Sequence, residues 1–97
     1  MELLLEWDAN KASENLRKHK VSFEEAKTIF NDPLLVTFPD EEHSQHEERL
    51  ISIGVSTKNK LLLVVHLERE ETAGYLLIRL ISCRRATRLE QKTYEEN

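Results

Sequence analysis

The sequence predicts an α+β fold in which an antiparallel sheet carries two N-terminal helices and one C-terminal helix. Two short apolar runs, Leu61–Val65 and Tyr75–Ile81, flank a polar linker that ends in Gly74, as in a β-hairpin. Apolar residues at helical spacing follow Val21, and a further helical pattern follows the hairpin. The chain has 97 residues, of which 39% are hydrophobic and 33% charged, so we expect one globular domain over residues 1–97.

The first element is a short strand over residues 2–7, which alternate weakly in polarity. Asp8 is a good N-cap for a helix over Ala9–Lys18. Few apolar residues line this helix, so we expect it to lie on the surface of the sheet. Trp7 is expected in the core, and His19 suits the negative end of the helix dipole.

A second helix begins at Ser22, which has capping-box spacing with Glu25. An apolar stripe follows at helical spacing. The helix ends before Pro33, because the residue that precedes a proline avoids the α region.

The rest of the chain predicts four strands and a last helix. We expect the strand over Leu61–Arg69 to be buried on both faces, because its apolar run is continuous. In the last helix, Ala86–Glu95, the side chains of Ala86, Leu89 and Thr93 are expected to point inward, and all helices are expected on one side of the sheet. The other predicted strands are Leu34–Phe38, Arg49–Ser56 and Tyr75–Ser82.

The net charge of −4 argues against a nucleic-acid partner only if charge is spread evenly over the chain. Residues 79–92 carry five cations against Glu90 alone, whereas residues 40–48 carry five carboxylates. The local electrostatic field of such a cluster, not the net charge, determines which partner binds there. The basic stretch can therefore bind an anionic partner, and the alternative is that its charges only contact water. No apolar run approaches the roughly 20 residues that span a bilayer, so we expect a cytoplasmic protein without membrane contact.

Two polar residues interrupt the apolar hairpin, His66 and Arg79. Counted from the centre of the linker they lie at similar depth, so an antiparallel register makes them cross-strand neighbours. Glu68 lies two residues beyond His66 and is expected on the same face. These three side chains would supply a proton acceptor, a proton donor and an anion-binding group. The alternative is a structural histidine beside two solvated charges, and a slip of one residue would separate the set.

Arg84, Arg88 and Lys92 recur every four residues and share a helical face if the last helix begins early, with Arg85 beside them. The planar guanidinium of arginine donates two hydrogen bonds to phosphate at once, so this stripe suits an RNA backbone. An acidic partner, the acidic stretch at 40–48 and plain solvation are the alternatives.

Other candidate residues give weaker indications. His43 and His46 lie among carboxylates, which is a poor indication of a metal site without fixed geometry. Cys83 has cationic neighbours that would lower its thiol pKa, but the sequence reveals no base beside it. Gly54 and Gly74 do not form a phosphate-binding loop. We therefore expect neither a metal nor a cofactor.

Several short motifs follow one another along nearly the whole chain. They are Glu6-Trp7-Asp8 with Lys11; Asn15-Leu16-Arg17-Lys18-His19 with Val21-Ser22-Phe23-Glu24-Glu25-Ala26; Asp32-Pro33; His43-Ser44; Glu48-Arg49; Ile53-Gly54; Val64-Val65-His66 with Arg69; and Ile78-Arg79, Ile81-Ser82, Arg84, Ala86-Thr87, Glu90 and Tyr94. In this order they resemble the BrnT family of toxins. One departure is Lys20, where the family usually has glycine.

The resemblance implies a small ribonuclease toxin of a bacterial type II toxin–antitoxin module, with a fold similar to that of RelE. It also implies a cognate BrnA-like antitoxin, a small DNA-binding protein that blocks the toxin. Operator DNA is then reached only through the antitoxin. RelE-like enzymes are expected to cleave RNA without a metal ion, by attack of a 2′-OH on the adjacent phosphate.

This chemistry needs proton transfer and cations around the transition state. We assign proton transfer to His66 or Glu68, and stabilisation of the transition state to Arg79 and Arg84. The residues expected to position RNA, with the tyrosine ring stacking on a base, are Arg69, Arg85, Arg88 and Tyr94.

The competing interpretation is a non-catalytic module that binds a partner or a nucleic acid. In that case the arginines bind an acidic or phosphate-bearing ligand without chemistry. Expression without the neighbouring gene distinguishes the two, because a ribonuclease toxin arrests growth and a binding module does not.

Overall fold

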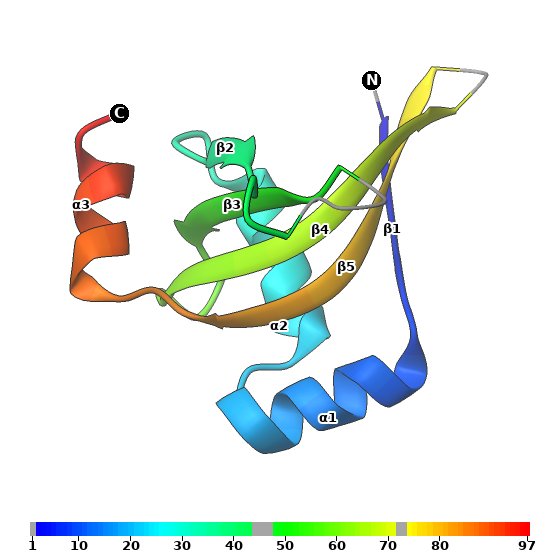
Figure 1. Cartoon of the computed structure of the whole chain (residues 1–97), viewed down its shortest axis with the longest axis horizontal. Helices are drawn as coiled ribbons and strands as arrows, with labels where there is room; N and C mark the ends of the chain where they lie inside the picture. Colours follow the sequence, from blue (N-terminus) through cyan, green and yellow to red (C-terminus); the bar gives the residue numbers. More distant parts are fainter. Residues whose placement is uncertain (1, 44–47, 72–73) are drawn as a thin grey trace.

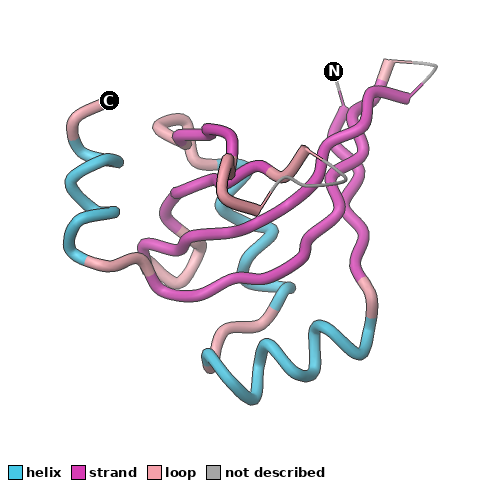
Figure 2. Tube along the Cα trace, viewed as in Figure 1, coloured by secondary structure: helices cyan, strands magenta, loops and turns pink. Residues whose placement is uncertain are grey.

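A computed structural model describes residues 2–43, 48–71 and 74–97 (Figures 1 and 2). It confirms the α+β class, with a five-stranded sheet, three α-helices and a 3₁₀ helix within the described residues. In chain order these are β1 Glu2–Trp7, α1 Ala9–His19, α2 Phe23–Ala26, the 3₁₀ helix η1 Lys27–Asn31, β2 Val36–Pro39, β3 Leu50–Val55, β4 Leu61–Glu71, β5 Tyr75–Arg85 and α3 Arg88–Glu95.

The strands follow the order β1-β5-β4-β3-β2 across the sheet. The four strands from β2 to β5 pair antiparallel, as predicted. The first strand is the exception, because β1 runs parallel to β5, with Glu6 opposite Arg79. The chain leaves β1 through the helices and enters the sheet again at the far edge, so β1 lies against the last strand and not against the next one (Figure 1).

A β-bulge shifts the register between β4 and β5. Val65 lies opposite Ser82, whereas the next residue, His66, lies opposite Leu80, so β5 carries the extra residue Ile81 at this point. Leu67, not His66, is therefore the partner of Arg79. Because successive side chains of a strand point to opposite faces, the prediction that His66 and Arg79 share a face is wrong.

Both predicted N-caps are present. The carboxylate of Asp8 accepts a hydrogen bond from the backbone N–H of Lys11 at 3.2 Å, and Ser22 Oγ accepts one from the N–H of Glu25 at 3.0 Å. The capping box is not completed, because the buried carboxylate of Glu25 accepts a hydrogen bond from Ser56 Oγ at 2.7 Å. Glu25 therefore ties α2 to the end of β3.

The turn between α1 and α2 places Lys20 in the left-handed region, with φ 63°. Its backbone N–H donates to the carbonyl of Leu16 at 3.0 Å and closes the helix. Glycine adopts this conformation without steric cost, whereas a residue with a side chain is strained there. The turn therefore explains why glycine is expected at this position. The Lys20 ammonium donates to the carbonyl of Arg17 at 2.8 Å.

The main core lies between one face of the sheet and the helices α2 and η1. Leu62 and Val64 point into it, and Leu63 between them is buried on the opposite face, which confirms burial of β4 on both faces. Trp7 packs against this core with its ring edge-on to Phe23 at 5.8 Å between centroids. The buried residues of the core are Val21, Phe23, Ala26, Ile29, Leu62, Val64, Ile78, Leu80 and Cys83.

The C-terminal helix α3 does not join this core. Its Glu90 binds Arg84, which alternates with the core residue Cys83 and therefore points to the opposite face of the sheet. The prediction that all helices lie on one side is therefore wrong for α3, which contacts β3 (Figure 1). Leu89 is 75% exposed, contrary to the expectation that it points inward, and none of the described residues of α3 is buried.

Candidate active site

Two adjoining pockets lie along the sheet face that α2 leaves open. The larger, of about 500 Å³, is named the arginine pocket here. Its cations are Lys11, Arg49, Arg69 and Arg79, and its carboxylates are Glu6, Glu48 and Glu68. The smaller, of about 390 Å³, is named the side pocket, and Arg49 lines both. The two pockets are therefore neighbours on this face of the sheet.

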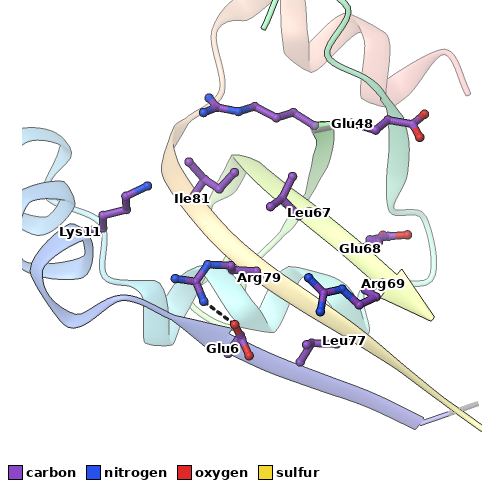
Figure 3. A pocket seen from close by; sticks show the side chains of 10 residues that line it. Glu6, Lys11, Glu48, Leu67, Glu68, Arg69, Leu77, Arg79 and Ile81 are labelled. Carbon is purple, nitrogen blue, oxygen red and sulfur yellow. Dashed lines mark hydrogen bonds and ion pairs between the residues drawn. The ribbon is translucent and has the colours of Figure 1, made fainter. Parts of the chain in front are cut away.

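Arg79 lies at the centre of the arginine pocket, where it forms an ion pair with Glu6 of the neighbouring strand β1 (Figure 3). The parallel register of β1 and β5 places the two residues side by side. Both side chains remain nearly half exposed, at 47% and 43%. The carboxylate therefore orients the guanidinium without removing it from solvent, and Arg79 can still contact an anion.

Glu68 lines the arginine pocket, although its side chain leaves β4 on the face of His66 and not on the face of Arg79. The pairing of β3 with β4 extends only as far as His66, so Glu68 lies beyond the covered part of the strand. Its side chain is 29% exposed, and partial burial raises the pKa of its carboxyl. A raised pKa makes the carboxylate a better proton acceptor near neutral pH. Figure 3 shows Glu68 and Lys11 on opposite sides of the strand that carries Arg79.

His66 is fully buried and faces the helices, so it does not line either pocket. Its Nε2 is hydrogen-bonded to Ser52 Oγ at 2.7 Å, and Ser52 Oγ is in turn hydrogen-bonded to Thr37 at 2.7 Å. The Phe30 ring meets the imidazole edge-on at 5.1 Å. Burial lowers the pKa of His66 to about 4, so the ring is neutral at pH 7. Direct contact between His66 and bound RNA is therefore excluded in this conformation.

One contact links this buried histidine to the pocket. His66 Nδ1 lies 3.7 Å from the Glu68 carboxylate and has no hydrogen-bond partner among the described residues. At 3.7 Å the pair is longer than a hydrogen bond, so it is a weak electrostatic contact. His66 is in the right place to restrict the position of Glu68, although it cannot take a proton from RNA itself.

Arg84 lines the side pocket, where Glu90 of α3 binds it through both guanidinium nitrogens at 2.8 Å. The hydrogen bond from Arg84 is the largest of the effects that lower the pKa of Glu90 to about 2. Glu90 also completes a capping box with Thr87. Arg84 lies in β5, ahead of α3, so the predicted helical stripe with Arg88 and Lys92 does not exist.

The remaining residues predicted to bind RNA differ in position. Arg69 lines the arginine pocket, while Arg85 and Arg88 are exposed and line neither pocket. The Tyr94 hydroxyl donates a hydrogen bond to Asp32 at 2.6 Å, which raises the pKa of Tyr94 to about 12. Tyr94 therefore anchors α3 to the loop after η1.

Cys83 does not have the features of a reactive thiol, and His43 does not belong to a metal site within the described residues. Cys83 is buried, and this burial raises the pKa of its thiol to about 11, which is opposite to the shift that its cationic neighbours suggest. The imidazole of His43 lies 3.2 Å from both carboxylate oxygens of Asp40. His46 lies outside the described residues. Over the described ranges, no group of three His, Cys, Asp or Glu side chains could hold a metal ion.

Comparison with known families matches this architecture to one of them. The model of the family described as "Ribonuclease toxin, BrnT, of type II toxin-antitoxin system" matches residues 7–90. The chain belongs to the BrnT family. It is therefore a ribonuclease toxin of a type II toxin–antitoxin system, a class that acts on RNA and has an antitoxin partner.

A solved BrnT structure shares the fold. The 1.1 Å crystal structure of the Brucella abortus ribonuclease toxin BrnT is similar to this chain with a TM-score of 0.60. The two chains are 21% identical, and the match covers 91% of this chain and 100% of that chain. No curated protein matches significantly. Among the described residues, none of the helices is long and apolar enough to cross a membrane.

Reasoning from the sequence missed part of the arginine pocket of this BrnT-family chain. Lys11, Glu48 and Arg49 line the pocket but were given no role. They lie far from the hairpin in sequence, and only folding brings them together. A signal was available, because all three lie in the motifs that resemble the BrnT family.

Proposed function

We propose that this ribonuclease toxin cleaves RNA in the arginine pocket without a metal ion. The observation that carries the proposal is that four cations and Glu68, a carboxylate of raised pKa, line one open pocket. Cations stabilise the charge that develops on the phosphorus oxygens in the transition state, and a raised pKa makes a carboxylate a better proton acceptor.

In the proposed reaction a 2′-OH of the RNA attacks the adjacent phosphorus. Glu68 takes the proton of the 2′-OH as the new oxygen–phosphorus bond forms. The bond from phosphorus to the 5′-oxygen breaks, and the leaving oxygen receives a proton from Lys11 on the opposite side of the pocket (Figure 3). The products are a 2′,3′-cyclic phosphate and a 5′-hydroxyl, and none of these steps uses a metal ion.

Arg79 stabilises the transition state in this proposal, and Glu6 holds its guanidinium in place. Arg49 and Arg69 contact the flanking phosphates. Arg84 lines the side pocket and is bound there by Glu90, so we place it beside the neighbouring nucleotide and not at the scissile phosphate. His66 positions Glu68 from beneath.

Arg85, Arg88 and Tyr94 are placed outside the two pockets. We assign the two arginines to the RNA backbone where it leaves the sheet, since both side chains are exposed. The ring of Tyr94 stacks on a base in this proposal, while its hydroxyl keeps α3 in place.

The test is cleavage of a mixed-sequence RNA in the presence of EDTA. We expect the wild type to cut, and Glu68→Gln and Arg79→Ala each to slow cutting by about 10² to 10⁴ fold. Lys27→Gln is the matched control, because Lys27 lies on η1 beneath the opposite face of the sheet. Unfolding in urea confirms that each variant is folded.

Loss of cutting in EDTA would overturn the metal-free reaction. Unchanged cutting in both Glu68→Gln and Arg79→Ala would remove the reaction from this pocket. A folded wild type that cuts no RNA would favour a ribosome-dependent enzyme or a binding module.

In the cell, we propose that RNA cleavage in the cytoplasm inhibits translation and growth. A cognate BrnA-like antitoxin neutralises the toxin, and operator DNA is bound through that antitoxin alone. The family description supports the antitoxin partner and the RNA substrate. Expression with and without the neighbouring gene tests this, and growth arrest that the neighbouring gene does not relieve would contradict it.

A further inference from the structure

The side pocket adjoins the arginine pocket but differs from it in character. Arg49 lines both, so an RNA phosphate held there places the neighbouring nucleotide at the side pocket. The volume of about 390 Å³ lies within the range of roughly 300–1,000 Å³ that is typical of small-ligand sites. The question is which part of a nucleotide it suits.

The floor of the side pocket is apolar. Ile51 and Val65 lie directly opposite each other on β3 and β4, and Leu63 lies one step along the same face. These three aliphatic side chains form an apolar patch, to which Leu63 contributes little because it is only 5% exposed, and apolar side chains are among those that hold an unstacked base. The floor therefore suits the face of a nucleobase.

The walls of the side pocket are acidic. Its charged lining consists of Asp40, Glu42 and Glu90 against the cations Arg49 and Arg84, and the imidazoles of His19 and His43 also line it. Glu90 neutralises Arg84 through two hydrogen bonds of 2.8 Å, so negative charge is in excess. A second phosphate is disfavoured there, whereas a base with hydrogen-bond donors on its edge is accepted.

Among the wall carboxylates, Glu42 is the one available to a ligand. Glu90 is engaged by Arg84, and Asp40 lies beside the His43 imidazole with an 11% exposed side chain. Glu42 is exposed and has no hydrogen-bond or ion-pair partner among the residues that the structure describes. Two adjacent N–H donors match the two oxygens of one carboxylate, and guanine presents N1–H and the N2 amino group side by side. Adenine, cytosine and uracil each place an acceptor beside their donor.

We propose that the side pocket is a nucleobase subsite in which a base lies on Ile51, Leu63 and Val65 and Glu42 selects guanine. This inference deepens the proposed function, on which it rests for the position of the scissile phosphate. It names the nucleotide next to that phosphate as a guanosine.

The first test measures binding of the four nucleoside 3′-monophosphates to the folded protein by NMR titration. We expect 3′-GMP to bind about 10-fold more tightly than the other three, with shifts at Ile51 and Val65, because one bidentate base contact discriminates by roughly this order. Glu42→Gln should bring the four affinities within about 2-fold of each other, since the amide replaces one acceptor with a donor. Glu41→Gln is the matched control, because Glu41 is the adjacent exposed carboxylate and lines neither pocket.

The second test maps the cut sites of the wild type on a mixed-sequence RNA. We expect guanosine at one fixed position beside the cut, and loss of this bias in Glu42→Gln but not in Glu41→Gln. Equal binding of all four monophosphates, or a guanine preference that Glu42→Gln retains, overturns the inference even if RNA is cut. Selective binding of 3′-GMP by a protein that cuts no RNA upholds the subsite and overturns the proposed function instead.

Discussion

At the scale of single residues, His66 illustrates how position overrides residue type. Histidine in a hairpin beside Glu68 suggests a catalytic pair, yet the imidazole is fully buried and hydrogen-bonded to Ser52. Burial favours the neutral ring, which lowers the pKa of His66 from 6.5 to about 4. The residue therefore stabilises the fold only while it stays neutral.

This shift predicts a dependence of stability on pH. The unfolded chain takes up a proton at His66 as the pH falls through 6.5, whereas the folded protein does not until about pH 4. Stability present above pH 6.5 is thus lost as the pH falls, by about 2 kcal/mol between pH 8 and pH 5. Urea unfolding across this range should show the slope, and His66→Gln should flatten it. An equal slope in the variant, or a ring that NMR shows titrating near its ordinary value, would contradict the prediction.

The same residue shows what the sequence could and could not predict. Alternation identified the polar residues of the hairpin, but their shared face depended on the register. The extra residue Ile81 shifts that register, and nothing in an apolar run of β-branched and leucine residues marks where a bulge falls. Glu68 shares the face of His66 as predicted, but it is separated from the face of Arg79, and it lies past the last residue of β4 that pairs with β3.

At the scale of elements, the helices α2 and α3 are stabilised in different ways. The apolar stripe of α2 predicted its burial, and Phe23 and Ala26 are in the core. The pattern of α3 predicted the same for Leu89, which is instead exposed. Two polar contacts hold α3, from Glu90 to Arg84 and from Tyr94 to Asp32. Long-range polar contacts leave no periodic trace in a sequence, so the orientation of α3 could not be predicted.

Tyr94→Phe tests this attachment, because it removes the hydroxyl and keeps the ring. We expect the free energy of unfolding to fall by about 1 kcal/mol, since a hydrogen bond to a charged carboxylate is lost at a partly exposed site. Amide exchange in α3 should accelerate more than in β4. Tyr75→Phe at the start of β5 is the matched control. A Tyr94→Phe protein with unchanged stability and unchanged exchange in α3 would show that the contact does not hold the helix.

At the scale of the whole molecule, the net charge of −4 has the same sign as the charge of the proposed RNA substrate and therefore opposes binding. The fold removes this conflict because it distributes the charges unevenly over the surface. Lys11, Arg49, Arg69 and Arg79 come from α1, the loop before β3, β4 and β5, and they meet in one pocket. The excess of acidic residues lies elsewhere, including the walls of the side pocket. The net charge and the local charge clusters could be predicted from the sequence, but only the fold combines cations that are almost 70 residues apart.

The sign of the salt dependence shows whether the net charge or the arginine pocket governs RNA binding. If net charge governed, added salt would screen repulsion and strengthen binding. If the arginine pocket governs, salt weakens binding, and four phosphate contacts give a slope of about −3 in log K against log salt concentration. A 2′-O-methyl RNA allows the measurement, because it binds without a 2′-OH to attack. Arg69→Gln should reduce the steepness by about 0.7, while Lys27→Gln should leave it unchanged. A flat or positive slope in the wild type would mean that RNA does not bind through these four cations, and the proposed site would have to be given up.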